Sequence, residues 1–193
     1  MREHCLVCHY PLSTCLCATI TEVSSAIKVS ILQDPIESKH AKNTARLAPL
    51  LLPHAQIYIG LIESDFAPLM EKTKQVKRNL LVYPSADAKP LGNQHSNCPY
   101  DHIIILDGTW RKARKLWLNN PWLHSIDACE IKAEAGSQYH IRKAPNEQSL
   151  STLEAIAWTL HTLESCNIEP FFKALEGLQT QWLKQPFFKA NRE

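Results

Sequence analysis

Segments with the apolar periodicity of strands alternate with segments that have the apolar periodicity of helices along this chain. Short apolar or alternating runs rich in β-branched residues predict strands, and longer segments with apolar residues three and four positions apart predict helices. The predicted strands are 26–33, 55–61, 79–83, 102–106 and 125–131. The predicted helices are 38–52, 65–78, 110–118, 150–164 and 170–184, and 85–99 is predicted as a loop.

The run His-Ile-Ile-Ile-Leu at 102–106 is the clearest strand, because it is almost continuously apolar. Such runs are expected where both faces of a parallel sheet are covered. Strands that alternate with helices therefore favour an α/β domain with a mainly parallel sheet and helices on both faces.

Length and charge narrow the choice of protein class. A chain of 193 residues favours one principal domain with a small appendage. The net charge of +2 is too small for the whole surface to attract nucleic acid, so any such attraction must come from local basic patches.

No apolar run is long enough to cross a bilayer, and the N-terminus lacks a secretory signal core. We expect a cytoplasmic protein with no membrane contact and no obligate protein partner.

Four of the seven cysteines crowd into the first 17 residues, in the pattern Cys5-x-x-Cys8 and Cys15-x-Cys17. Clustering of this kind in a cytoplasmic protein indicates a metal site and not a disulfide framework. Four thiolates suit a structural zinc ion, although the spacing also allows iron. A histidine, His4 or His9, could replace one thiolate.

The segment 1–20 forms a cysteine-rich head that we expect to need this metal in order to fold, and 21–193 is the main domain. A redox role for the head is less favoured, because its Cys-x-x-Cys lies outside any βαβ unit. The other three cysteines, Cys98, Cys129 and Cys166, are predicted to be packing residues.

The polar segment Asp107-Gly108-Thr109-Trp110 directly follows the clearest strand and leads into a helix. Ligands of α/β proteins bind beyond the carboxyl ends of strands, and a helix start can bind a ligand carboxylate. Asp107 could act as a base or hold a ligand amine, and Gly108 permits close backbone approach. The alternative is ordinary helix capping by Asp107 or Thr109, with Trp110 in the core.

The helix that follows carries a run of basic residues, which either form a solvated helix face or contact phosphates beside a ligand site. They are Arg111, Lys112, Arg114 and Lys115.

The segment Asp107-Gly108-Thr109-Trp110 resembles the Asp-x-Thr-Trp signature of the DTW-domain family. Other stretches agree with that family in order from about residue 5 to 165: the cysteine pattern of the head, Gln33-Asp34-Pro35-Ile36-Glu37 with Asn43-Thr44-Ala45-Arg46-Leu47, Tyr83-Pro84, Tyr139, Arg142-Lys143-x-Pro145, and Leu150-Ser151-Thr152-Leu153-Glu154-Ala155. Val7 and Tyr10 stand where members often carry arginine, which weakens the case for RNA contacts by the head.

The resemblance implies a tRNA-uridine aminocarboxypropyltransferase with a fold related to SPOUT methyltransferases, including a C-terminal knot. Such an enzyme moves the 3-amino-3-carboxypropyl group of S-adenosylmethionine to N3 of a tRNA uridine and releases methylthioadenosine. The nucleophile N3 carries a proton that a base must take, and we favour Asp107 for this role. Alternatively, Asp107 anchors the donor's amino group while water removes the proton. Glu37 is a second candidate carboxylate.

Two further sets of site residues follow from the resemblance and from position along the chain. The expected donor pocket consists of Tyr83, Pro84, Gly108, Thr109, Trp110, Ser151 and Thr152. The expected RNA contacts are Arg46, Arg111, Arg114, Arg142 and Lys143. Ser151 and Glu154 also fit a capping box, so the start of that helix could serve either role or both.

Two rival functions remain at this point. A SPOUT-like RNA methyltransferase would use the same donor but release S-adenosylhomocysteine. A zinc-containing RNA-binding protein without catalysis would bind tRNA and make no product.

Overall fold

The computed structural model describes residues 3–92, 100–131, 136–141 and 149–184. Within them the chain forms one sheet of six strands in the order β2-β1-β5-β3-β6-β4, and every neighbouring pair is parallel. The strands are β1 Lys28–Gln33, β2 Gln56–Ile59, β3 Asn79–Val82, β4 Lys89–Pro90, β5 His102–Asp107 and β6 Asp127–Glu130. The predicted parallel sheet is confirmed.

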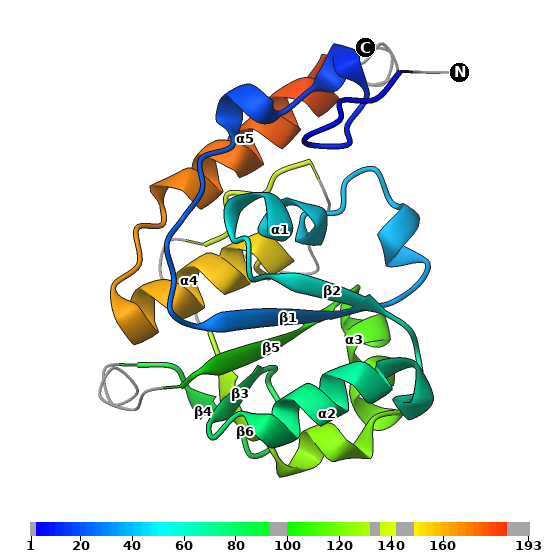
Figure 1. The fold of residues 1–193 in the computed structure, drawn as a ribbon, viewed down its shortest axis with the longest axis vertical. Helices are drawn as coiled ribbons and strands as arrows, with labels where there is room; N and C mark the ends of the chain where they lie inside the picture. Colours follow the sequence, from blue (N-terminus) through cyan, green and yellow to red (C-terminus); the bar gives the residue numbers. More distant parts are fainter. Residues whose placement is uncertain (1–2, 93–99, 132–135, 142–148, 185–193) are drawn as a thin grey trace.

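Helices cover both faces of the sheet, as predicted (Figure 1). The α-helices of the described residues are α1 Ala48–Leu51, α2 Ala67–Gln75, α3 Trp110–Leu118, α4 Thr152–Glu164 and α5 Glu169–Leu183. Successive strand residues point to opposite faces, so Ile31 and Ile105 share a core with α1 and α4. Their neighbours Leu32 and Ile104 pack with α2 and α3.

The cysteine-rich head lies against α5, on the side of the molecule away from the sheet (Figure 1). Its two short 3-10 helices are η1 Leu12–Thr14 and η2 Cys17–Thr19. Gly177 of α5 allows this approach, since a Cβ there would lie 2.4 Å from Oγ1 of Thr19. Tyr10 and Leu16 are buried in the same apolar core as α4 and α5.

The predicted helix at 38–52 is wrong. The structure has two 3-10 turns, η3 Glu37–Lys39 and η4 Ala45–Leu47, followed by the single turn of α1. The Asn43 side chain accepts a hydrogen bond from the amide of Ala45 at 2.8 Å and donates one to the carbonyl of Glu37 at 2.8 Å. An asparagine that bonds the backbone in this way competes with a helix.

Smaller departures concern the edges of elements. The predicted loop at 85–99 contains the edge strand β4, and α2 is preceded by a 3-10 turn, η5 Glu63–Phe66. Another such turn, η7 Pro121–Ser125, lies before β6. None of the described helices is both long and apolar enough to cross a bilayer.

Candidate donor pocket, basic groove and metal centre

A pocket of about 350 Å³ opens at the carboxyl edge of the sheet, beyond the ends of β3, β5 and β6. Its walls come from strand ends, from the starts of α3 and α4, and from the 43–44 and 139 segments. Asp107 and all seven residues predicted for the donor site line it: Tyr83, Pro84, Gly108, Thr109, Trp110, Ser151 and Thr152. The structure therefore brings together residues from three separate parts of the sequence.

Asp107 is placed by the register of the sheet. Its neighbour across β1 and β5 is Gln33, and the preceding pair on that face is Ile31 and Ile105. The row of side chains therefore changes from apolar to polar where it reaches the pocket. Asp107 is only 5% exposed, and its Oδ2 accepts a 2.8 Å hydrogen bond from Nε2 of Gln33.

The alternative of ordinary helix capping does not describe Asp107. The N-cap of α3 is Thr109, and among the described residues its side chain makes no capping hydrogen bond. The Asp107 carboxylate instead accepts hydrogen bonds from Gln33, from Nδ2 of Asn43 at 3.5 Å and from the hydroxyl of Thr152. These three side chains lie on elements other than α3.

Glu37, the second candidate carboxylate, lines the same pocket but has a cation beside it. Nζ of Lys112 lies 2.9 Å from Oε1 of Glu37 and 3.8 Å from Oδ1 of Asp34. One of the four basic residues of α3 is therefore turned inward. Gly108 permits this packing, because a Cβ there would lie 2.9 Å from Cβ of Lys112.

The start of α4 combines a cap with a pocket wall. The hydroxyl of Ser151 accepts from the amide of Glu154 at 3.4 Å, and Glu154 accepts from the amide of Ser151 at 2.7 Å. The predicted capping box is confirmed. Glu154 also accepts a 2.6 Å bond from the amide of Gln138, which fixes the segment that leads to Tyr139 in the pocket wall.

A basic groove of about 450 Å³ adjoins the pocket and shares Tyr83, Pro84 and Trp110 with it. Its other lining residues are Arg111, Arg114, Lys115, Leu118 and Asn119. Trp110 is 48% exposed, and its indole N–H donates to the hydroxyl of Ser149 at 3.2 Å. The indole therefore lies at the boundary between the pocket and the groove, outside the core.

Tyr83 stands at the same boundary with two rings behind it. Its ring stacks on Trp117 with centroids 5.9 Å apart, and Trp117 lies 4.1 Å from the ring of His124. Burial raises the pKa of Tyr83, and the positive charge of Arg114 opposes the rise. The edge of the groove is thus both aromatic and basic.

Arg46, which was also predicted to contact RNA, does not line this groove. The Arg46 guanidinium lies over the ring of Tyr10, 4.2 Å from its centroid, between the head and the main domain. Burial raises the pKa of Tyr10 to about 12, although Arg46 opposes the rise. Arg142 and Lys143 lie outside the described residues, as does Cys98.

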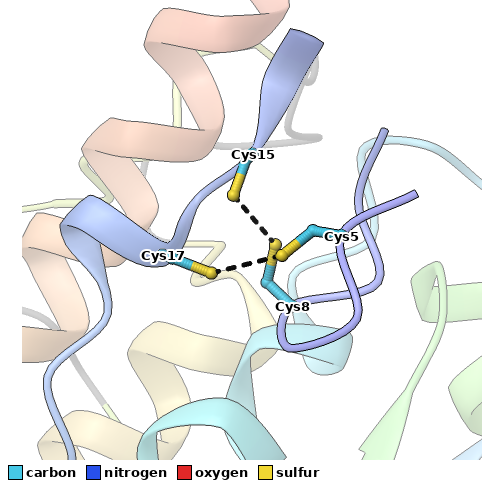
Figure 2. A group of neighbouring side chains, drawn as sticks. All are labelled: Cys5, Cys8, Cys15 and Cys17. Atoms are coloured by element: carbon cyan, nitrogen blue, oxygen red, sulfur yellow. Dashed lines mark hydrogen bonds between the residues drawn. The ribbon is translucent and has the colours of Figure 1, made fainter. Parts of the chain in front are cut away.

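The four cysteines of the head converge, as predicted. Figure 2 shows their side chains pointing toward one another from two turns of the chain. Sγ of Cys5 lies 3.5 Å from Sγ of Cys17, Sγ of Cys8 lies 3.6 Å from Sγ of Cys15, and all four sulfurs lie within 4.8 Å of one another. Among the described residues, neither His4 nor His9 belongs to this group.

The backbone shapes the first pair of ligands. His9 has a left-handed φ of 60°, and its amide donates to the carbonyl of Cys5 at 3.0 Å, which closes the turn that carries Cys5 and Cys8. Backbone hydrogen bonds lower the pKa of Cys5 to about 6. Hydrogen bonds with the thiols of Cys5 and Cys15 raise the pKa of Cys17 to about 12. Thiolates this close together need a shared cation to be ionised at once, so the donor set fits a tetrahedral metal ion.

The family model of the DTW domain matches residues 2–187. This chain belongs to the DTW-domain family. The predicted family assignment is therefore confirmed, and the DTW match covers both the head and the main domain.

The DTW relatives carry one name. The chain is 34% identical over 172 residues to tRNA-uridine aminocarboxypropyltransferase 2 of Drosophila melanogaster, covering 85% of this chain and 68% of that protein. It is 29% identical over 186 residues to the proteins of that name from Macaca fascicularis and Mus musculus, covering 92% of this chain and 62% of each. A match to a solved structure described as a hypothetical protein covers 83% of this chain and 82% of that chain, with 12% sequence identity and a TM-score of 0.29.

Sequence reasoning assigned no role to several residues of this DTW pocket. Asn43, Thr44 and Tyr139 line it, and all three belong to the stretches that resemble the family. That resemblance was the available signal for them. Cys129 was predicted to be a packing residue, and it is fully buried in the wall of the pocket.

Proposed function

We propose that this chain transfers the 3-amino-3-carboxypropyl group of S-adenosylmethionine to N3 of a tRNA uridine and releases methylthioadenosine. The observation that carries the proposal is the pocket, since the DTW turn and the other residues predicted for the donor line one cavity. The names of the relatives support the same reaction.

The reaction forms one bond and breaks one. The lone pair of N3 attacks the first carbon of the donor's amino-acid arm, and the bond from that carbon to sulfur breaks. Its electron pair stays on sulfur, which becomes the neutral thioether of methylthioadenosine, and N3 loses its proton. The sulfonium already activates the carbon, so the protein's main task is to position the two reactants.

The basic groove supports tRNA as the acceptor. Arg111 and Arg114 are exposed on α3 and can contact phosphates, while Tyr83 and Trp110 offer aromatic faces at the entrance to the pocket. A uridine must leave its stacked position for N3 to reach a buried donor. A groove that joins the pocket suits a flipped nucleotide whose neighbours remain outside.

The head suits a structural zinc ion held by Cys5, Cys8, Cys15 and Cys17, which leave no open position for a reactant. We accordingly propose the division into a head at 1–20 and a transferase domain at 21–193. A cytoplasmic location also remains a proposal. So does the SPOUT-like C-terminal knot, which the resemblance to the DTW-domain family implies.

The test is to incubate the purified, metal-loaded protein with unmodified tRNA and S-adenosylmethionine, followed by mass spectrometry of nucleosides and small molecules. We expect a uridine that gains the aminocarboxypropyl mass, together with methylthioadenosine. A methyl gain with S-adenosylhomocysteine would instead identify an RNA methyltransferase. tRNA binding with no product would favour the non-catalytic protein.

A further inference from the structure

We propose that Gln33, Asn43 and Thr152 form a clamp that holds Asp107 as an ionised, immobile acceptor for the donor's amino group. The clamp residues are positioning residues, and the proton of uridine N3 then passes to solvent water. This inference rests on the proposed function and decides between the two roles that the sequence leaves open for Asp107.

Gln33 is fixed by the sheet. It is the last residue of β1 and the register partner of Asp107, the last residue of β5. Side chains of register partners lie on the same face of a parallel sheet. The 2.8 Å bond from Nε2 of Gln33 to Oδ2 of Asp107 therefore joins two side chains whose backbones are held in the centre of the sheet.

Asn43 is fixed by the backbone around it. Its Oδ1 must accept, because it faces the amide N–H of Ala45 at 2.8 Å, and its Nδ2 must donate, because it faces the carbonyl of Glu37 at 2.8 Å. These bonds leave only one orientation of the side-chain amide. The other hydrogen of Nδ2 is available to Oδ2 of Asp107, 3.5 Å away.

Thr152 reaches the other oxygen of the carboxylate. It is the first residue of α4, and the capping box of Ser151 and Glu154 already fixes that end of the helix. The hydroxyl of Thr152 donates to Oδ1 of Asp107. Donors from β1, from the 43–45 segment and from α4 thus converge on both oxygens of one buried carboxylate.

This arrangement suits a carboxylate that binds the amino group of S-adenosylmethionine better than one that acts as a general base. Hydrogen bonds to a carboxylate stabilise its ionised form, whereas a general base works best when its proton affinity matches the operating pH. Protonation of Asp107 would also weaken its hydrogen bonds to side chains that the surrounding backbone fixes in place. An ionised carboxylate in the pocket wall can instead bind an ammonium group and thereby aim the amino-acid arm of the donor.

The test compares the binding of two ligands to the metal-loaded protein by calorimetry. S-adenosylmethionine carries the amino group, and methylthioadenosine lacks the whole arm. We expect Asp107→Asn to lower the affinity for S-adenosylmethionine by ~10- to 100-fold, the size expected for loss of a hydrogen bond to a charged group. The affinity for methylthioadenosine should stay unchanged. Thr152→Val should produce a smaller loss of the same kind, and Thr152→Ser, which keeps the hydroxyl, should restore affinity. Thermal melts of each variant check folding.

Other outcomes overturn the inference. If Asp107→Asn binds both ligands normally and loses transfer, Asp107 is the base. If affinity for both ligands falls equally, Asp107 only shapes the pocket. Failure of the wild-type protein to bind S-adenosylmethionine would instead contradict the proposed function itself.

A second measurement uses the pH dependence of single-turnover transfer at saturating donor. If water takes the proton, the rate should rise with pH until N3 itself ionises, and Asp107→Asn should keep this slope at a lower rate. If Asp107 takes the proton, the wild-type rate should level off once the carboxylate is ionised, and the variant should lose that dependence. The second pattern would contradict the clamp.

Discussion

The cysteine head and the strand-edge pocket are assembled in different ways. The four converging cysteines of the head lie within a short stretch, with Cys5 only 12 positions from Cys17. The pocket depends on residues far apart in sequence, since Asp107 is 74 positions from Gln33 and 45 from Thr152. The local chain brings the first set together, whereas the sheet and α4 bring the second.

This difference has an energetic consequence. The head contributes few residues to the apolar core and would hold its shape through its metal. The pocket is carried by strands whose side chains fill both cores, so its polar residues lie at the end of well-packed rows. Loss of metal and loss of a pocket contact should therefore have distinct effects on stability and on ligand binding.

The largest expected effect is the loss of the metal. Cys8→Ser should abolish binding of one metal ion per chain and destabilise the head on the order of 5 kcal/mol, part of the ~10–16 kcal/mol that structural zinc contributes in zinc-finger peptides. Metal analysis and thermal unfolding measure both quantities. Cys166→Ser is the control, because Cys166 is also buried but lies outside the cluster. Full metal content in Cys8→Ser would show that the four thiols are not one site.

The docking of the head on α5 can be tested without touching the metal ligands. Gly177→Ala should destabilise the protein by about 2 kcal/mol, since its Cβ would lie 2.4 Å from Oγ1 of Thr19. In an undocked helix the same change would instead stabilise by roughly 1 kcal/mol. Urea unfolding measures the change. Adding Thr19→Ala should remove only part of the loss, because it removes Oγ1 and Cγ2 but keeps Cβ, which would lie 2.9 Å from the new Cβ. A stabilising single variant would contradict the docking.

Acid should weaken the sheet from the end opposite to the pocket. His102 begins β5, and its ring bonds Asn79 and Ser30 at 2.8 Å each. Burial first, then the charges of Lys72 and Lys28, lower the pKa of His102 to about 4. The unfolded chain therefore binds a proton more readily, so stability falls as pH drops below about 6.5 and continues to fall to about pH 4.

The expected contribution of His102 is about 2 kcal/mol lost at pH 5 relative to neutral pH. Urea unfolding at the two pH values measures it, with His102→Gln as the comparison. The variant is less stable at neutral pH but should lose less on acidification. An equal loss in both proteins would assign the acid sensitivity to other groups.

The smallest expected effect concerns the groove. Arg114→Ala should weaken tRNA binding several-fold, because one phosphate contact is lost. The slope of the logarithm of the binding constant against the logarithm of salt concentration should become shallower by about 1. Arg78→Ala removes the same charge at the exposed residue that precedes β3, at the other end of that strand from the groove. Filter binding at several salt concentrations compares the two. Equal losses would mean that the groove has no special part in tRNA binding.

How much the sequence could predict follows from the same contrast. Spacing alone identified the four cysteines that converge in the head, and the continuous apolar run identified β5 and the strand-end position of Asp107. The helix predicted at 38–52 failed because Asn43 bonds the backbone on both sides of itself, which a periodicity of apolar residues does not register.

The clamp was beyond sequence reasoning for a further reason. Gln33 and Asp107 become neighbours only through the register of β1 and β5, and Thr152 reaches them only because α4 begins beside that edge. Similarly, Lys112 belongs to a basic run that indicates a solvated or RNA-binding surface, yet it turns inward to Glu37. Pairings of this kind depend on the fold and leave no local trace in the sequence.

The proposed reaction transfers the amino-acid arm of S-adenosylmethionine and not the methyl group. The most direct test supplies unmodified tRNA and either of two forms of S-adenosylmethionine, one labelled at the methyl carbon and one at the carboxyl carbon. We expect the carboxyl label to enter tRNA uridine and the methyl label to leave with methylthioadenosine. Methyl label in tRNA, with the carboxyl label in S-adenosylhomocysteine, would contradict the proposed reaction.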